Sequence, residues 1–349
     1  LDQAQDFLEA SGKLSVLCHR EEIEASLRTP GYGGFQMLDL QDFSGQGTAL
    51  VGMLNVFMES KGLIASEEWR EFCCETVPLL WMRKYTWTND ETLRARIRLA
   101  HYGPADLNGQ TVTWEITAGE KRVASGETAA VDVPTGTVSE IDLISAKLGA
   151  IKRAQKVVVT LNVRDTRFQN SYPLWVYPAK LEVTAPKGLL VARSFGKNVR
   201  AALADGASVL LLPRPEEIKH TVAIAFQTSF WSPMFRRPDR LSPLGVETPG
   251  TQGLLCDPEH PLFADFPTEY HANWQWWQLV KKSSPMILDA TPQAYRPLLQ
   301  VIDGFDRNHK LGLIVEARVG KGKLLICSID LLCVQQHPEA RQLLAGIYS

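Results

Sequence analysis

The residues best placed to do chemistry follow an apolar run near the start of the chain. Residues 34–40 predict a buried strand, and Asp39, Gln41 and Asp42 stand where that strand ends. Gln46 follows in a loop punctuated by glycines. A buried strand whose C-terminal end opens into acidic and amide side chains is typical of the active-site rim of a (β/α)8 barrel.

The same stretch resembles the last barrel strand of glycoside hydrolase family 2 enzymes, the group of β-galactosidases, β-glucuronidases and β-mannosidases. The similar residues run from Gly33 to Thr48 and continue through Leu50–Gly52. Thr76–Leu79 and Asn89–Thr92 resemble the passage from barrel to β-sandwich in one subgroup of this family. The best-known members of that subgroup have tryptophan in an aromatic-rich eighth strand, whereas this chain has Gln36–Asp39 there. The resemblance therefore leaves the sugar specificity open.

The resemblance implies that the rim residues could bind the hydroxyl groups of a sugar. The alternative is that Asp39 and Gln41 only tie the loop together and that residues 44–48 cap the next helix. Retaining glycoside hydrolysis needs two carboxylates about 5–5.5 Å apart, one acid/base and one nucleophile. In the family the acid/base is a Glu directly after an Asn on the fourth strand, and no Asn of this chain is followed by Glu.

The predicted eighth strand begins at residue 34, whereas a whole barrel takes about 250 residues. We therefore expect the C-terminal piece of a larger glycosidase, with no catalytic residue of its own. The nucleophile would belong to the seventh strand, ahead of Leu1. We interpret the Glu21, Glu22 and Glu24 cluster as the solvated face of a helix.

Tryptophans concentrate in the C-terminal half of the chain, at Trp231, Trp274, Trp276 and Trp277. Trp274 and Trp276 alternate with a glutamine, which would place both rings on one face of a strand. Indole rings can stack on the apolar faces of sugars, so the cluster could bind a glycan. Tryptophan also fills cores and interfaces, and both interpretations stay open.

Three short runs resemble the C-terminal α/β domain of the same subgroup, which is similar to a trimerisation domain and to the class I glutamine amidotransferase fold: His260–Phe263, Trp274–Trp277 and Gly320–Leu325. An amidotransferase places its cysteine in a G-x-C-x-G elbow, and the sequence around Cys256 lacks the second glycine. We therefore expect no cysteine catalysis. The six cysteines show no CxxC spacing, so neither a metal site nor a cofactor is predicted.

Composition excludes two classes of partner. The net charge is −2 without a long basic run, which argues against nucleic acid. No stretch approaches eighteen apolar residues, which argues against a membrane span. The compartment stays open, a periplasmic or secreted parent being one option.

Periodicity divides the 349 residues into three parts. Residues 1–84 predict helices around the single strand, with one helix over 50–60. Residues 85–180 alternate with period two, as in Leu93–Leu99, and predict an immunoglobulin-like β-sandwich. Residues 181–349 mix apolar strands with helices and predict a three-layer α/β domain, similar to amidotransferases or flavodoxins.

The predicted fold class is thus a multidomain α and β protein that begins with the remnant of a (β/α)8 barrel. The expected function is the accessory region of a retaining exo-glycosidase acting on β-linked sugars, inactive alone. The alternative is a carbohydrate-binding or oligomerisation module without catalysis. Expected partners are carbohydrate, the remainder of the barrel and a second copy of the chain. We also expect the helices of residues 1–65 to pack on the sandwich or on another chain.

Overall fold

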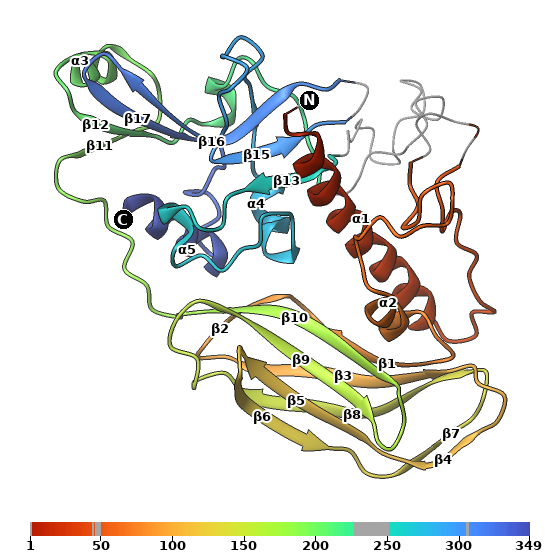
Figure 1. Ribbon diagram of the computed structural model, residues 1–349. Coiled ribbons are helices and arrows are strands. Elements are labelled where there is room, and N and C mark those ends of the chain that lie inside the picture. The colour runs from red at the N-terminus through yellow and green to blue at the C-terminus, as the bar shows by residue number, and fades with distance from the viewer. Residues whose placement is uncertain (1, 44, 46–49, 227–250, 305–306) are drawn as a thin grey trace. The chain divides into compact units, whose positions relative to one another are not determined.

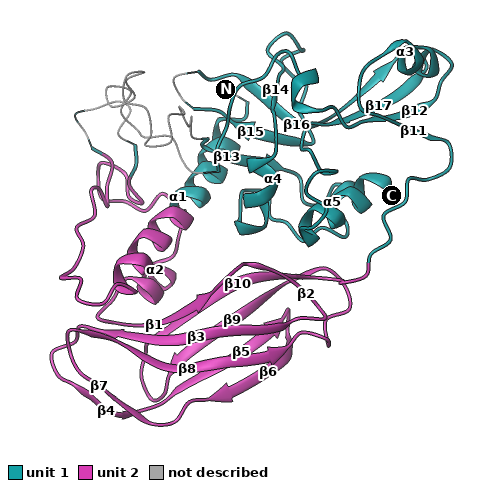
Figure 2. Cartoon of the chain, turned by 180° about the vertical axis from the view of Figure 1, so that it is seen from behind, with its two compact units in different colours: residues 1–15, 43–51, 181–349 teal, residues 16–42, 52–180 magenta. Residues whose placement is uncertain are grey.

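The computed structural model describes residues 2–43, 45, 50–226, 251–304 and 307–349 (Figure 1). Over these residues the protein is a mixed α/β structure in which strands predominate and no closed barrel forms. The chain divides into two compact units, shown in teal and magenta in Figure 2. We call residues 1–15, 43–51 and 181–349 the α/β unit, and residues 16–42 and 52–180 the sandwich unit. One division falls after residue 180, and residues 1–84 are shared between both units.

The sandwich unit contains the predicted β-sandwich. Its three-stranded sheet has the order β1 (Thr76–Met82), β3 (Thr92–His101), β8 (Thr137–Lys147). Its five-stranded sheet has the order β2 (Thr86–Thr88), β10 (Gln169–Tyr177), β9 (Gln155–Val163), β5 (Val112–Ala118), β6 (Lys121–Glu127). A short ladder joins β4 (Leu107–Gln110) to β7 (Val131–Val133). All pairs are antiparallel except β2 with β10.

The alternating pattern of β3 determines which of its faces lies inside. Leu93, Ala95 and Ile97 are buried in the core between the two sheets, where they pack with residues of β5, β9 and β10. Arg94 and Arg96 point to the opposite face and are exposed. This confirms the predicted strand with one solvated face, since side chains two positions apart share a face of the sheet.

Helices cover one half of the outer face of the three-stranded sheet. The second half of α1 (Ala4–Leu27) buries Ile23 and Leu27, and α2 (Ser66–Phe72) buries Phe72. These side chains pack on Val77 and Leu79 of β1, together with Ala100 of β3. Within the sandwich unit, the expectation that the early helices pack on the sandwich is therefore confirmed.

The interpretation of Glu24 as a solvated residue is wrong. Its side chain is completely buried on the inner face of α1, where Arg20 Nε lies 3.1 Å from Oε1 and Arg28 forms a second ion pair. Asn170 Nδ2 and the Tyr172 hydroxyl donate to the same carboxylate, each at 3.1 Å. A buried carboxylate requires such partners, because burial of an unpaired charge is costly.

The α/β unit is built on a mixed sheet. Its order is β11 (Leu189–Ala192), β12 (Ser208–Leu211), β17 (Gly322–Cys327), β16 (Lys310–Val319), β15 (Leu299–Ile302), β13 (Gly253–Cys256), and β14 (Met286–Ile287) also pairs with β16. The pairs β11–β12 and β12–β17 are parallel and the others are antiparallel. Short apolar strands in the middle of the sheet follow from burial on both faces.

Helices and turns of this unit agree well with the sequence. Helix α3 (Lys197–Ala204) links β11 to β12 and packs its Val199 and Leu203 on them, so the three elements form a βαβ unit. The β16–β17 hairpin turns at Gly320, which has a φ of +61°. The remaining helical segments are η1 (Pro215–Glu217), η3 (Pro261–Phe263), η4 (Trp274–Trp276), α4 (Trp277–Lys281) and α5 (Pro338–Tyr348). Among the helices in the described part of the chain, none is both long and apolar enough to cross a bilayer.

The predicted strand over 34–40 is absent, and this segment has no regular secondary structure. Its sheet-like contacts are confined to its end, where Leu54 N donates to Leu40 O at 3.1 Å and Asp42 N donates to Leu54 O at 3.0 Å. An apolar pattern makes a strand only where neighbouring strands satisfy its backbone. Among the described residues, no other strand runs beside this segment.

The predicted helix over 50–60 is also wrong. The side chain of Asn55 accepts hydrogen bonds from the backbone amides of Phe57 at 2.9 Å and Glu59 at 3.0 Å. Such local bonds compete with helical ones, and Met58 adopts a positive φ of 66°. By contrast, α1 is one continuous helix, and Pro78 lies inside β1.

Candidate functional site

Three of the predicted rim residues, Asp39, Gln41 and Asp42, lie in the sandwich unit. Asp42 holds two segments together there. Its carboxylate accepts from Gly52 N at 3.0 Å and forms an ion pair with Lys61 Nζ at 2.6 Å. Gly52 is required there, because a Cβ at this position would lie 2.3 Å from the backbone carbon of Gln41. Asp42 is buried, and in this structure its side chain stabilises the loop through these two contacts.

The other rim residues are less constrained. Asp39 is half-buried, and Gln41 is exposed while its backbone bridges to Leu54. Gln46 lies outside the described residues, as does Trp231. A substrate-binding role for these side chains stays a prediction.

Exposed apolar side chains surround the rim segment. Leu38 is 82% exposed and Phe57 is 78% exposed. The full set, which we call the apolar loop set, is Tyr32, Phe35, Leu38, Leu40, Val56, Phe57 and Met58. A hollow of about 510 Å³ also separates residues 34–38 from the side chains of α1, among them His19, Glu22 and Ile23. So many exposed apolar side chains in one region are characteristic of a surface that another chain or domain covers.

The tryptophans of the α/β unit lie in helical turns rather than on a strand. Trp274 and Trp276 belong to η4, so the predicted alternation on one strand face is wrong. Trp276 is completely buried, where its Nε1 donates to Thr268 Oγ1 at 3.0 Å and its ring meets Phe266 edge-on. Trp274 is half-buried and stacks on Phe226 at 5.4 Å. Of the two rings, only Trp274 retains exposed surface, and glycan binding there stays a prediction.

Four of the five buried carboxylates in the described residues pair with a lysine or an arginine, and the fifth, Glu339, lies beside His337, whose pKa burial lowers. The pairs are Glu24 with Arg20, Asp42 with Lys61, Asp303 with Arg307, Asp330 with Arg193, and Glu339 with His337. The distances between the nitrogen and oxygen atoms of these pairs are 3.1, 2.6, 2.5, 3.1 and 3.8 Å in that order. A general acid needs the opposite environment, in which burial without a cation keeps the carboxyl protonated. The four carboxylates that pair with lysine or arginine lack that environment.

The buried cysteines are poor nucleophiles. Cys256 lies at the end of β13, and burial raises the pKa of its thiol to about 12. Cys327 is completely buried in β17, where desolvation has the same effect on its pKa. Because the thiolate is the reactive species, neither residue is activated. Within the described ranges, no group of three or more His, Cys, Asp or Glu side chains could hold a metal ion.

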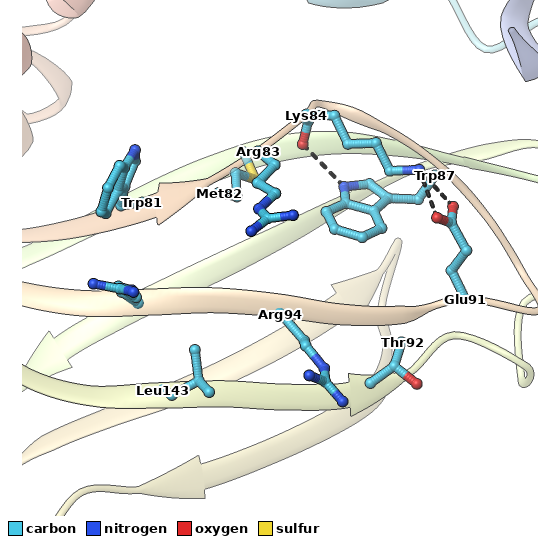
Figure 3. A pocket seen from close by; sticks show the side chains of 10 residues that line it. Trp81, Met82, Arg83, Lys84, Trp87, Glu91, Thr92, Arg94 and Leu143 are labelled. Atoms are coloured by element: carbon cyan, nitrogen blue, oxygen red, sulfur yellow. Dashed lines mark hydrogen bonds and ion pairs between the residues drawn. The ribbon is translucent and has the colours of Figure 1, made fainter.

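A groove on the sandwich unit escaped the sequence predictions (Figure 3). Its volume is about 570 Å³, and its walls include Trp81, Trp87, Arg83, Arg94, Arg96 and Leu143. Lys84 Nζ lies 4.6 Å from the centre of the Trp87 ring and pairs with Glu91 at 2.6 Å. The run from Trp81 to Lys84, aromatic then basic, was the available signal. That signal alone does not predict the groove, because the sequence of residues 76–82 does not indicate a strand that would place Trp81 beside the arginines of β3.

Two family models match parts of the chain. Residues 190–349 match a family model described as a domain of unknown function (DUF8487). Residues 91–178 match a second one, described as a domain of unknown function (DUF8488). No curated protein matches the chain.

Similarity to solved structures is weak and local. A Pseudomonas fluorescens alkylpurine DNA glycosylase (AlkC) shows 15% identity and a TM-score of 0.25, over 30% of this chain and 31% of its own. A family 123 glycoside hydrolase from Clostridium perfringens shows 6% identity and a TM-score of 0.24, over 44% and 38%. A β-glucuronidase from Parabacteroides merdae shows 10% identity and a TM-score of 0.23, over 45% and 26%. The chain thus spans less than two fifths of each of these proteins, and glycoside hydrolases are among its weak structural neighbours.

Proposed function

We propose that this chain is the C-terminal accessory region of a retaining exo-glycosidase of the family 2 type, which acts on β-linked sugars. In this proposal residues 1–84 complete a (β/α)8 barrel, residues 85–180 are an immunoglobulin-like sandwich, and residues 181–349 are a three-layer domain similar to amidotransferases. The chain does not cleave glycosidic bonds alone. Its partners are the remainder of the barrel and, through it, carbohydrate.

The apolar loop set is the observation that carries this proposal. Residues 32–42 follow α1 with a strand-like apolar sequence, yet residues 34–38 line a hollow and four of the apolar side chains are exposed: Tyr32, Phe35, Leu38 and Leu40. Strands of a barrel would supply both the backbone partners and the apolar contacts that this segment needs. Completion of the barrel would also bring Asp39, Gln41 and Gln46 to its C-terminal rim, where sugar hydroxyls bind.

The absence of catalysis by this chain rests on its carboxylates. Four of the five buried ones in the described ranges pair with a lysine or an arginine, and no Asn-Glu pair occurs in the sequence. The acid/base and the nucleophile would therefore come from the rest of the barrel.

The gene upstream of the codon for Leu1 tests this proposal. We expect an in-frame Asn-Glu pair and a later Glu, and we expect the longer protein to hydrolyse aryl β-glycosides. Substitution of either Glu by Gln should abolish that hydrolysis, while residues 1–349 alone should show none. Specific hydrolysis by residues 1–349 alone would contradict the proposal.

The apolar loop set also favours a second candidate, a non-catalytic module that binds another copy of the chain. Sedimentation velocity separates the two. A stable oligomer that covers the apolar loop set, without any upstream barrel sequence in the gene, would favour the oligomerisation module.

A further inference from the structure

The outer face of the three-stranded sheet changes character halfway along its strands. On β1 the outward positions pass from Val77 and Leu79, under α1 and α2, to Trp81. On β3 they pass from Ala100 to Arg96 and Arg94. The helices therefore leave the second half of the face bare, and this half forms one wall of the groove in Figure 3. We call its members Trp81, Arg83, Arg94, Arg96 and Leu143 the Trp–Arg face.

The Trp–Arg face carries positive charge that the protein does not neutralise. Arg96 and Arg98 share one acceptor, Glu140, at 3.3 and 3.6 Å. Arg83 and Arg94 form no ion pair or side-chain hydrogen bond with any described residue. The guanidinium groups of Arg83 and Arg94 are therefore available to bind an anion. In the view of Figure 3, Arg83 lies between the indole rings of Trp81 and Trp87.

Apolar surface lies beside these charges. Trp81 is 49% exposed and Leu143 is 52% exposed. The guanidinium groups of Arg96 and Arg98 lie 5.2 and 4.7 Å from the centre of the Trp81 ring, which fixes the position of the indole. The face thus combines a fixed aromatic ring, an aliphatic side chain and two unpaired cations.

We propose that the Trp–Arg face binds a glycan that carries uronic acid residues. A planar guanidinium matches a carboxylate in a bidentate geometry, and the indole and Leu143 offer apolar surface to the C–H faces of the pyranose rings. The choice of a glycan over another polyanion rests on the proposed function. The carboxylates of Glu91 and Glu140 at the groove disfavour a nucleic acid backbone, whose charge is continuous.

Calorimetric titration of the intact chain with tetragalacturonate, cellotetraose and tetraglutamate tests the proposal. We expect tetragalacturonate to bind more tightly than the other two, and we expect added salt to weaken its binding. Arg83→Gln, Arg94→Gln and Trp81→Ala should each raise its Kd by roughly three- to tenfold. Arg318→Gln is the matched control, because Arg318 is also exposed on a strand and unpaired among the described residues but lies in the α/β unit.

Three outcomes would overturn the proposal. They are equal binding of the acidic and the neutral tetrasaccharide, tetraglutamate binding as tight as that of tetragalacturonate, and Arg83 or Arg94 variants that behave like Arg318→Gln. Tight binding of tetraglutamate would identify an acidic protein partner instead. None of these results bears on the upstream gene or on hydrolysis, so the proposed function stands or falls separately.

Discussion

Glu24 shows how one residue joins a helix to the sandwich. Its carboxylate binds Arg20 and Arg28 on its own helix and Asn170 and Tyr172 on β10, all in the sandwich unit. Buried ion pairs add little net stability when intact, but removal of one partner leaves the other charges uncompensated. The network therefore makes the position of α1 specific.

We expect Glu24→Ala to lower the free energy of unfolding of the sandwich unit by about 3–5 kcal/mol. Urea denaturation followed by circular dichroism measures the change. Glu22→Ala is the control, since Glu22 is exposed on the same helix. Equal losses for the two variants would show that the network contributes nothing beyond helix propensity.

The thiols form a second test at this scale. Burial raises the pKa of Cys256 and Cys327, and a hydrogen bond with Asp330 raises that of the exposed Cys333. We therefore expect none of these three cysteines to react with iodoacetamide at pH 7 faster than free cysteine does, and we expect Cys327 to react only in denaturant. Mass spectrometry of the alkylated protein locates each site. A rapidly alkylated thiol would contradict this expectation and would support cysteine catalysis of the kind found in glutamine amidotransferases.

Among the elements, the loop that ends the rim segment depends on close backbone contact. Gly52 approaches Gln41 more closely than any residue with a Cβ could, and Asp42 binds its amide. Lys61 completes the loop through its ion pair with Asp42. Segments 40–42 and 52–61 are thereby held as one element without regular secondary structure.

Gly52→Ala should destabilise this element by about 1–3 kcal/mol, because the added methyl group collides with the backbone of Gln41. Limited proteolysis should then cut residues 52–61 faster than in the unaltered protein. Gly33→Ala is the matched control, since a Cβ at Gly33 meets nothing within 4 Å. Unchanged cleavage in Gly52→Ala would show that the loop can relax at no cost.

The sequence predicts secondary structure correctly where the residues of an element themselves show the pattern of a helix, a strand or a turn. The alternation of β3, the βαβ unit around α3 and the turn at Gly320 follow from local patterns. Predictions failed where residues far away in the sequence determine the secondary structure. Segment 34–40 is an example, because its strand-like sequence has no neighbouring strand in the described structure. They also failed where a side chain competes with the backbone, as Asn55 does. The Trp–Arg face could not be predicted because it requires the register between β1 and β3, which places Trp81 opposite Arg96.

At the scale of the whole molecule, the apolar loop set should make the isolated chain prone to self-association. Many exposed apolar side chains favour association, because each Å² of apolar surface removed from water stabilises the complex by about 25 cal/mol. Leu38 and Phe57 contribute the most exposed side chains of the set.

We expect the double variant Leu38→Lys and Phe57→Lys to reduce self-association of residues 1–349. Sedimentation velocity over a range of concentrations measures the effect. Leu143→Lys, which changes an exposed leucine on the Trp–Arg face, is the control and should leave association unchanged. If Leu143→Lys alone abolishes self-association, copies of the chain associate through the Trp–Arg face and not through the apolar loop set.

The α/β unit is assembled from stretches that are far apart in sequence. Ala10 and Leu14 of α1 are completely buried, Gly253 of β13 would place a Cβ 3.4 Å from Ala10 O, and Gln3 donates to Gln300 at 3.2 Å. A polypeptide cut to begin at residue 181 would lose this first stretch of helix and bare the strands it shields. Such a fragment should therefore be recovered in soluble form only when a peptide spanning residues 1–15 is supplied to it.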